Sequence, residues 1–431
     1  MLHNNLGINE KGNLTFVGYD TVELAKEYGT PAYFMDEDLI RENCQAYKNA
    51  LEENFGKGSM PLYASKAFSC KKIYEIANEE GIGCDVVSGG ELYTVYKSNF
   101  PMEKVFFHGN NKTNSDISLA LDCKIGYFVV DNREELTELN RQCKERGIKQ
   151  KILLRITPGI DPHTHKAVIT GNVDSKFGSA IETGQAMEIV KTALSLDNII
   201  LEGLHCHIGS QIFECEPFTD AAEIMIKFIK QIKDETSFEA KILNLGGGMG
   251  VRYIEEDPII DYKENINKIA KKIKTYVENN GIKMPIILME PGRSLVAAAG
   301  MTLYTVGSVK EIKGFKKYVS IDGGMPDNPR YALYQSLYTA IIANKANKTA
   351  DYECTIAGRC CESGDLIAEN IKIAHPERDD IMAILCTGAY NYSMASNYNR
   401  LPRPPVIMLS KDKKQIAVSR ESYDDLMRND L

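Results

Sequence analysis

The sequence has no pair of cysteines in a CxxC arrangement, although it contains 11 cysteines in 431 residues. An odd number of scattered cysteines does not suit a disulfide framework or a zinc ribbon, so we expect reduced thiols. No apolar run approaches the roughly 20 residues that span a bilayer, and residues 1–30 show no apolar core behind a basic start. We therefore expect no signal peptide, no membrane helix or membrane partner, and a cytoplasmic location.

A basic stripe is missing as well. The net charge of −8 is spread along the chain, without an alternation of aromatic residues and arginines. This pattern predicts no nucleic-acid partner and leaves small polar ligands open. The length and the 43% hydrophobic content suit a large core and two domains.

The chain also lacks the GxGxxG fingerprint that usually follows the first strand of an open doubly wound sheet. Present instead are short apolar stretches that alternate with helical stretches. The eight apolar stretches are PLYASKA, GCDVVSGG, KVFFHGN, YFVVDN, KILLRITP, LEGLHCHIG, KILNLGGG and PIILMEPGR. A strand followed by a helix, repeated eight times, is typical of a closed barrel. We predict an α/β fold with a parallel (β/α)8 TIM-like barrel, in preference to the open sheet.

The pattern changes after Gly300 to strand-like segments separated by turns. There are six: MTLYTVGSVKEI, KYVSIDGG, YECTIAGR, IMAILCTGAY, PPVIMLS and QIAVSR. These segments predict a mainly antiparallel β domain, a sandwich or a barrel, to which the opening segment with NLTFVGY could supply a strand. We therefore expect a segment 1–32 that joins the β domain, a barrel over 33–300 and a β domain over 301–431.

Barrel enzymes build their sites at the carboxyl ends of the strands, and polar residues gather at these ends. In order they are Lys66, Asp85 with Ser88, His108 with Asn110, Asp131, Arg155, His207 with Ser210, Gly246 to Gly248, and Glu290 with Arg293. Lys66 in YASKA has small neighbours after an apolar stretch, a pattern that suggests burial. Proteins tolerate a buried lysine when its charge is paired or its amine reacts. A lysine that reaches solvent from a strand end is the alternative.

Two glycine-containing motifs follow neighbouring strands. LGGGMG, at Leu245 to Gly250, would let backbone N–H groups approach a phosphate, although a tight turn is an alternative. EPGR, at Glu290 to Arg293, adds an acid and a guanidinium suited to an anion. Together the two motifs predict a phosphate cradle.

Histidines occur in two pairs, His205 with His207 in HCH and His163 with His165 in HTH. No third ligand stands at a recognised metal-site spacing, so we predict no metal. A histidine at a barrel rim can instead stack on a flat heteroaromatic ring. A lysine, a phosphate cradle, a stacking histidine and an acid are the parts that hold pyridoxal 5′-phosphate.

The order of the motifs YASKA, CDVVSGGEL, SKFG, HCHIGSQ, LGGGMG, EPGR, CESGD and GAYNYSMASNYN resembles one enzyme family. The family that the sequence resembles is that of the alanine-racemase-like, barrel-type (fold type III) pyridoxal-phosphate enzymes, and within this family the diaminopimelate decarboxylases. The resemblance covers nearly the whole chain. It implies that the barrel binds the cofactor and that the β domain contributes substrate and catalytic residues.

The resemblance also implies roles for individual residues. Lys66 would bond to the cofactor, and Cys361 would donate a proton from a second subunit, which implies a homodimer with shared active sites. The residues implied in cofactor binding are Lys66, His207, Ser210, Gly246, Gly247, Gly248, Glu290, Pro291, Gly292, Arg293 and Tyr390. The residues implied in substrate binding are Arg293, Arg330, Tyr334, Glu362 and Tyr390. For Cys361, the alternative is a buried structural thiol.

The implied reaction converts meso-2,6-diaminopimelate to L-lysine and CO2, the last step of lysine biosynthesis. Arg293 and Arg330 could hold the distal carboxylate of the substrate, which ornithine and arginine lack. Decarboxylases of those amino acids, a racemase of the same fold, a pyridoxal-phosphate carrier and a phosphate-binding module are the alternatives. The chain has Tyr331 and Arg359 where the family usually has prolines, which puts only the local loop shape in doubt.

Overall fold

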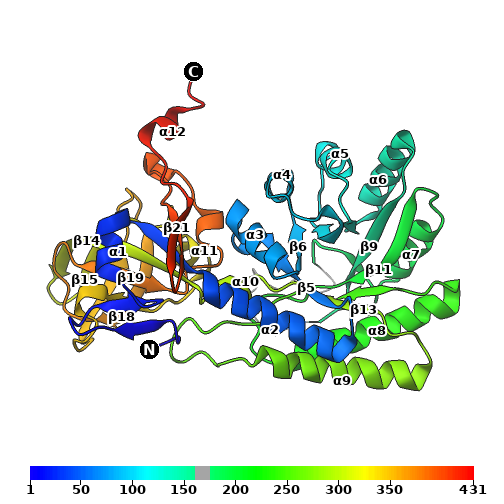
Figure 1. The fold of residues 1–431 in the computed structure, drawn as a ribbon, viewed down its shortest axis with the longest axis horizontal. Helices are drawn as coiled ribbons and strands as arrows, with labels where there is room; N and C mark the ends of the chain where they lie inside the picture. Colours follow the sequence, from blue (N-terminus) through cyan, green and yellow to red (C-terminus); the bar gives the residue numbers. More distant parts are fainter. Residues whose placement is uncertain (161–174) are drawn as a thin grey trace. The chain divides into compact units, whose positions relative to one another are not determined.

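The computed structural model describes residues 1–160 and 175–431 of the chain. The chain divides into two compact units, shown in sequence colours in Figure 1. The β unit comprises residues 1–42, 251–259 and 293–431, and the barrel unit comprises residues 43–250 and 260–292. These bounds differ from the expected ranges at residues 33–42, 251–259 and 293–300, where the chain belongs to the β unit.

The barrel unit contains eight parallel strands that close into a ring. They are β5 (Met60–Ala64), β6 (Gly83–Val86), β7 (Val105–Phe107), β8 (Tyr127–Val130), β9 (Gln150–Thr157), β11 (Ile199–His205), β12 (Ile242–Asn244) and β13 (Ile286–Met289). Strand β13 pairs with β5 and β8 pairs with β9, so the sheet has no open edge between them. The short β10 (Ser179–Ala180) adds to β9. The predicted (β/α)8 barrel, with all eight of its strands, is confirmed.

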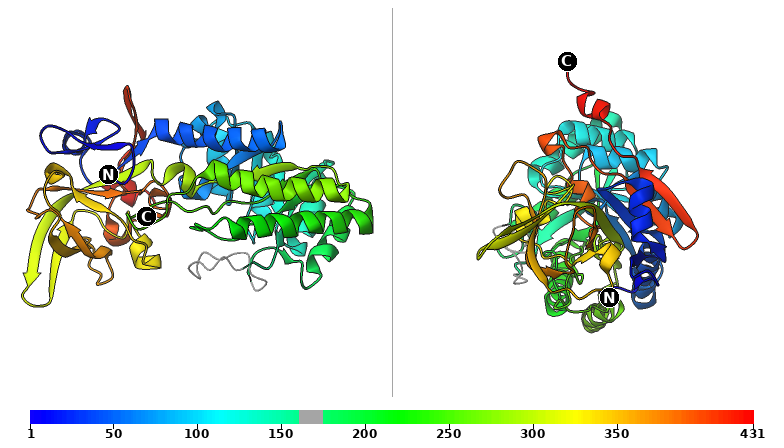
Figure 2. Two further views of the ribbon diagram at one scale, coloured as in Figure 1. Left: turned by 90° about the horizontal axis from the view of Figure 1, so that it is seen from below. Right: turned by 90° about the vertical axis from the view of Figure 1, so that its left-hand side faces the viewer.

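Helices alternate with the barrel strands (Figure 1). They are α3 (Lys71–Glu79), α4 (Gly89–Lys97), α5 (Asn114–Asp122), α6 (Arg133–Arg146), α7 (Gln185–Leu194), α8 (Glu216–Thr236) and α9 (Tyr262–Asn280), preceded by α2 (Glu37–Phe55). Helices α8 and α9 lie side by side (Figure 2) and bury the apolar positions that recur at helical spacing, such as Phe228 and Ile269. Within the described residues, no helix has both the length and the apolar character needed to cross a membrane.

The interior of the barrel is filled by apolar side chains. The central cluster takes one residue from each of six strands: Leu62, Phe106, Val129, Leu153, Ile242 and Leu288. A packed interior leaves the carboxyl ends of the strands as the place where polar side chains can gather.

The β unit is built on a mainly antiparallel sheet. Its strands are β4 (Ala32–Asp36), β14 (Gly300–Ile312), β15 (Lys316–Ile321), β16 (Ala340–Ile342), β17 (Tyr352–Ala357), β18 (Leu366–Ile373), β19 (Ile381–Leu385), β20 (Val406–Ser410) and β21 (Lys413–Val418). The order is β18-β17-β15-β14-β4-β20-β21, and β19 pairs with β14 and β16. Only the β15–β17 and β4–β20 pairs are parallel within this sheet. The predicted antiparallel domain is confirmed.

The N-terminal segment joins the β unit in a different way from the one expected. NLTFVGY lies in a separate small sheet of β1 (Leu6–Ile8), β2 (Leu14–Phe16) and β3 (Tyr19–Asp20). Strand β4 instead enters the large sheet, between β14 and β20. All five residues of β4 are buried, as suits a central strand covered on both faces.

Candidate active site

Four neighbouring barrel strands end at the residues expected to bind the cofactor. The strand order is β11-β12-β13-β5. His207 and Ser210 follow β11, Gly246 to Gly248 follow β12, Glu290 to Gly292 follow β13, and Lys66 follows β5. Because these strands are parallel, their carboxyl ends share one rim. The structure therefore brings this part of the expected set to adjacent positions.

Lys66 lies in the short 3₁₀ helix η1 (Ser65–Ala67) and is exposed. The expected burial is therefore wrong, because β5 ends at Ala64. The small neighbours have a different cause: a Cβ on Gly292 would lie 2.8 Å from the Cβ of Ala64 and 3.1 Å from that of Ala67. Ala64 also donates its N–H to the Pro291 carbonyl at 3.2 Å. The alanines thus permit the close approach of the segments that follow β5 and β13.

The glycine run after β12 is required by its backbone. Gly246 and Gly248 have φ values of 68° and 118°, which disfavour other residues. A Cβ on Gly247 would lie 2.0 Å from the Glu290 carbonyl oxygen. The Gly247 N–H donates to Nδ1 of the half-buried His207 at 3.2 Å. The run is a tight turn that ties β11 and β13 to β12.

The donor set of this rim fits pyridoxal phosphate. It offers an exposed amine at Lys66, a half-buried imidazole at His207, a half-buried hydroxyl at Ser210 and a buried carboxylate at Glu290, beside a turn without side chains. These are the groups that an aldehyde, a flat ring, a phosphate and a ring nitrogen need.

We expect Gly247→Ala to destabilise the protein by about 1–3 kcal/mol or more, because the new methyl group collides with a backbone carbonyl. Thermal unfolding followed by circular dichroism measures this loss. Gly90→Ala is the matched control, since its Cβ would meet only Ser88 Oγ, at 3.8 Å. Equal melting temperatures for the two variants would contradict the close packing at the turn.

The Glu290 carboxylate lies in a buried cluster of polar side chains. His205 Nε2 is 3.1 Å from Oε2, and His108 Nε2 is 2.9 Å from Oε1. Asn244 donates its Nδ2 to Oε1 at 2.6 Å. One donor atom from each histidine and one from Glu290 lie within 4.8 Å of one another, a spacing that could also suit a metal ion. His163 and His165 lie outside the described residues.

Sequence reasoning placed His108 and His205 near the rim but gave neither of them a role, and it missed Asn244. The signal for Asn244 was weak, since it is the last residue of a buried strand rather than part of the glycine motif. Asp85, on β6, is also buried, and its Oδ1 has no hydrogen-bond partner. Burial and, next, the charge of Glu290 raise the pKa of Asp85 well above its usual value.

The expected substrate-binding arginines lie in the β unit, at the first residues of α10 (Arg293–Val296) and α11 (Arg330–Tyr334). Both are buried. Arg293 donates to the Tyr253 hydroxyl at 2.8 Å, and Arg330 donates to the Tyr338 hydroxyl at 2.8 Å. The Arg293 guanidinium also lies 4.7 Å from the centre of the Tyr390 ring. The structure therefore brings Arg293 and Tyr390 together, with two tyrosines that sequence reasoning missed.

Cys361 and Glu362 are exposed on one loop of the β unit, whereas Tyr334 is half-buried at the end of α11. The exposure of Cys361 rules against the alternative of a buried structural thiol. The Cys361 N–H donates to Asn399 Oδ1 at 2.8 Å, and the Tyr398 hydroxyl lies 3.5 Å from Glu362 Oε2. All 11 cysteines of the chain are free, as expected.

A buried carboxylate fixes this loop. Asp365 accepts the N–H of Cys360 at 2.7 Å on Oδ2 and the N–H of Met325 at 2.6 Å on Oδ1. A Cβ on Gly358 would lie 2.2 Å from Oδ2, so the glycine leaves room for the carboxylate. Asp365 therefore joins the loop of Cys361 to the segment that leads to Arg330.

The two departures from the family pattern have different surroundings. Tyr331 is buried, and its hydroxyl donates to Glu369 at 2.7 Å. The same carboxylate forms an ion pair with Lys316. Arg359 is exposed, and its N–H donates to the Gly323 carbonyl at 2.9 Å. At position 331, where the family usually has proline, the tyrosine is therefore held by burial of its ring and by the hydrogen bond to Glu369.

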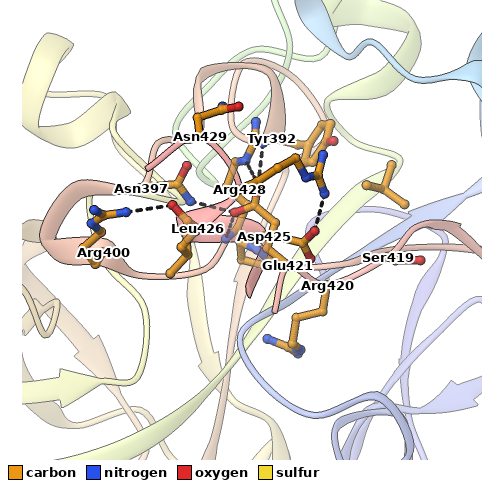
Figure 3. A pocket seen from close by; sticks show the side chains of 13 residues that line it. Tyr392, Asn397, Arg400, Ser419, Arg420, Glu421, Asp425, Leu426, Arg428 and Asn429 are labelled. Atoms are coloured by element: carbon orange, nitrogen blue, oxygen red, sulfur yellow. Dashed lines mark hydrogen bonds and ion pairs between the residues drawn. The ribbon is translucent and has the colours of Figure 1, made fainter. Parts of the chain in front are cut away.

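A cavity of about 720 Å³ lies in the β unit. Figure 3 shows the side chains that line it, among them arginines. Arg400 pairs with Asp430 at 2.7 Å, Arg403 pairs with Glu421, and Arg428 pairs with Asp425. Each of these pairs neutralises a cation at the cavity wall. The cavity is therefore a poorer candidate for an anion site than its arginine content suggests.

Comparison with known proteins gives the family. Residues 37–297 match the model of the pyridoxal-dependent decarboxylase, pyridoxal binding domain. The chain is 47% identical to the diaminopimelate decarboxylase of Bacillus methanolicus, with 97% of both chains covered. It is 46% identical to that of Bacillus subtilis (strain 168), with 100% of this chain and 98% of the relative covered.

Solved structures agree with these relatives. The structure of the diaminopimelate decarboxylase from M. jannaschii in complex with L-lysine superposes with a TM-score of 0.93 at 36% identity, over 100% of this chain and 98% of the other. The enzyme from Helicobacter pylori, also in complex with L-lysine, gives a TM-score of 0.87 at 30% identity, over 95% of this chain and 98% of the other. By its sequence, its barrel and the donor set on the barrel rim, the chain belongs to the diaminopimelate decarboxylases, a family of pyridoxal-dependent decarboxylases.

Proposed function

We infer that the protein decarboxylates meso-2,6-diaminopimelate to L-lysine and CO2 with pyridoxal 5′-phosphate as cofactor, the last step of lysine biosynthesis. The observation that carries this inference is the rim formed by β11, β12, β13 and β5, where an amine, an imidazole, a glycine turn and a carboxylate lie at adjacent strand ends. The inference is also supported by two diaminopimelate decarboxylases that are 46–47% identical to this chain and are covered over 97–98% of their length.

The chain's own residues divide the work of holding the cofactor. Lys66 would hold the aldehyde carbon through its amine, Ser210 and the turn at Gly246 to Gly248 would hold the phosphate, and His207 would hold the ring. The carboxylate of Glu290 would hold the ring nitrogen and favour its protonated form. Pro291, Gly292, Arg293 and Tyr390 complete the set. When bound, pyridoxal phosphate supplies the electron sink for the electron pair that a departing carboxylate leaves behind.

Substrate selection rests on the far end of diaminopimelate, which is itself an amino acid. Arg293 and Arg330 hold its distal carboxylate, and Glu362 holds its distal ammonium. Tyrosine hydroxyls rather than carboxylates accept from the two arginines, so these contacts orient the guanidinium groups without an acidic partner. Tyr334 and Tyr390 line the same end. Ornithine and arginine offer no distal carboxylate to this pair.

The remaining step is a proton transfer. The α-carboxylate leaves as CO2, and a proton takes its place on the α-carbon. Cys361 supplies this proton, or a lysine does. The exposed loop of Cys361 supports its role as a group presented to the active site of a second subunit. We accordingly propose a homodimer with shared active sites, located in the cytoplasm.

Two variants test whether Arg330 and Glu362 bind the distal amino-acid group of diaminopimelate. We expect Arg330→Ala and Glu362→Ala each to lower kcat/KM for diaminopimelate about 30- to 5,000-fold, which corresponds to about 2–5 kcal/mol, because a charged substrate group would be left buried and unpaired. Steady-state kinetics measure the loss, while the absorbance of bound cofactor should persist. Arg378→Ala, which removes an arginine whose side chain is 75% exposed, is the control. Normal kinetics in either variant would refute the assignment.

One assay tests the proposed function itself. The purified protein is incubated with pyridoxal phosphate and, separately, with meso-diaminopimelate, ornithine, arginine or lysine, and CO2 release is recorded. We expect release from diaminopimelate alone. Release from ornithine or arginine would identify a decarboxylase of the related type, racemisation without CO2 would identify a racemase, and cofactor binding without either would identify a carrier.

A further inference from the structure

The Glu290 carboxylate is held from two sides of the barrel. His205 is the last residue of β11, His108 directly follows β7, and Glu290 directly follows β13. These three strands are not neighbours in the ring, so the side chains meet across the barrel interior. The two imidazole rings also contact each other, with centres 4.8 Å apart and planes at 71°. The cluster thus depends on barrel closure rather than on a local motif.

Both oxygens of the carboxylate are engaged. Oε2 contacts His205 Nε2, while Oε1 contacts His108 Nε2 and accepts from Asn244. An ionised carboxylate only accepts hydrogen bonds, so His205 Nε2 must carry the proton. His108 Nε2 lies 2.9 Å from Oε1 but outside hydrogen-bond geometry. His205 and Asn244 are fully buried, and His108 and Glu290 nearly so. Exchange of these contacts for water is therefore restricted.

We propose that His108 and His205 are positioning residues that hold Glu290 as an anion and leave its negative charge available for the cofactor's ring nitrogen. This inference rests on the proposed function, in which Glu290 binds that nitrogen. Neutral imidazoles donate hydrogen bonds without supplying a positive charge, unlike a lysine or an arginine. Within the described part of the chain, no lysine or arginine pairs with this carboxylate. A protonated ring nitrogen can then supply the missing countercharge.

The ionisation of the cluster agrees with this arrangement. Burial lowers the pKa of His108, and burial lowers the pKa of His205 to about 4, so both rings are neutral at pH 7. Burial by itself would raise the pKa of Glu290, whereas the hydrogen bond from His205 and the close contact with His108 favour its ionised form. The other titratable and charged groups that bear on the cluster are Asp85 on β6, Asp131 after β8, Arg155 on β9, His207 after β11, Lys112 after β7 and Lys66 after β5.

The test compares His205→Phe with His205→Gln. Phenylalanine keeps a flat ring without a donor, whereas glutamine keeps an N–H donor. The dissociation constant of pyridoxal phosphate from the apoprotein is measured by absorbance titration. The spectrum of the bound cofactor is then recorded against pH. We expect His205→Phe to bind the cofactor about ten- to hundredfold more weakly, the effect of losing a hydrogen bond to a charged group.

We expect the spectrum of His205→Phe to change at a different pH from that of wild type, because the ring nitrogen is less readily protonated. His205→Gln should restore most of the affinity and the wild-type spectrum, a rescue that a merely structural role of the ring would not produce. His375→Phe replaces an exposed histidine that contacts Tyr352 in the β unit and should leave both readouts unchanged. If His205→Phe does not fold, as judged by circular dichroism, His108→Phe provides the same comparison with His108→Gln.

A folded His205→Phe protein with wild-type affinity and spectrum would overturn the inference. So would glutamine performing no better than phenylalanine, or a stoichiometric metal in the wild-type protein that His205→Phe loses. Failure of the proposed function looks different, because the wild-type protein itself would then fail to bind pyridoxal phosphate or to release CO2 from diaminopimelate.

Discussion

Lys66→Ala should lower turnover of diaminopimelate by about 10⁴-fold, the scale on which covalent catalytic residues act. The variant removes the only group proposed to bond to the cofactor's aldehyde carbon. Because Lys66 is exposed at the end of β5, its replacement by alanine should leave the fold and the melting temperature unchanged. Borohydride treatment of the wild-type holoenzyme, followed by peptide mapping, should place a pyridoxyl mass on Lys66.

Lys66→Arg separates chemistry from charge in this experiment. Arginine keeps a positive charge but stays protonated, so it should be nearly as inactive as alanine. Activity close to wild type in Lys66→Arg would mean that the position supplies only charge. A pyridoxyl mass on another lysine after borohydride treatment would overturn the assignment of Lys66 directly.

Mixing two inactive variants should restore activity. Lys66→Ala and Cys361→Ala homodimers are each expected to be nearly inactive. If each active site takes Lys66 from one subunit and Cys361 from the other, a heterodimer of the two variants contains one site with both mutations and one intact site. Random exchange of equal amounts should therefore recover roughly a quarter of wild-type activity. Steady-state assays before and after subunit exchange give the comparison.

Subunit exchange itself must be measured, for example by native mass spectrometry of differently tagged chains. A mixture of Lys66→Ala with Lys66→Arg is the control, because no combination of these subunits restores an intact site. Demonstrated exchange without recovery of activity would place Cys361 in the site of its own subunit or outside catalysis.

The barrel could be predicted because buried parallel strands appear in a sequence as short, continuous apolar runs. PLYASKA and KVFFHGN are examples that became β5 and β7. Strand β18, with the sequence LIAENIKI, was not predicted, because it lies at the end of its sheet and carries exposed polar residues among apolar ones. Strand β16 was missed because it has only three residues.

The candidate site was predictable where a motif lies in one short stretch. The glycine turn and the EPGR segment are such stretches, and they lie at adjacent strand ends. The exposure of Lys66 was not predictable, because its alanine neighbours pack against Gly292, more than 200 residues away in the sequence. The partners of Arg293 and Glu290, among them Tyr253 and His108, also come from distant segments that meet only in the folded chain.

Asp365 has a consequence for how this enzyme can change during evolution. It accepts the backbone N–H of Cys360, so this anchor of the loop does not depend on the side chains of Cys361 and Glu362. The Glu362 carboxylate adds a weaker local contact, since its Oε1 accepts the N–H of Gly364 at 3.3 Å. Substitutions at the two positions can therefore alter chemistry or substrate preference while the Asp365 anchor stays in place. Asp365 and Gly358, by contrast, can change only together, because any side chain larger than that of glycine at 358 would collide with the carboxylate. New specificities in this fold are therefore most accessible through the two exposed residues.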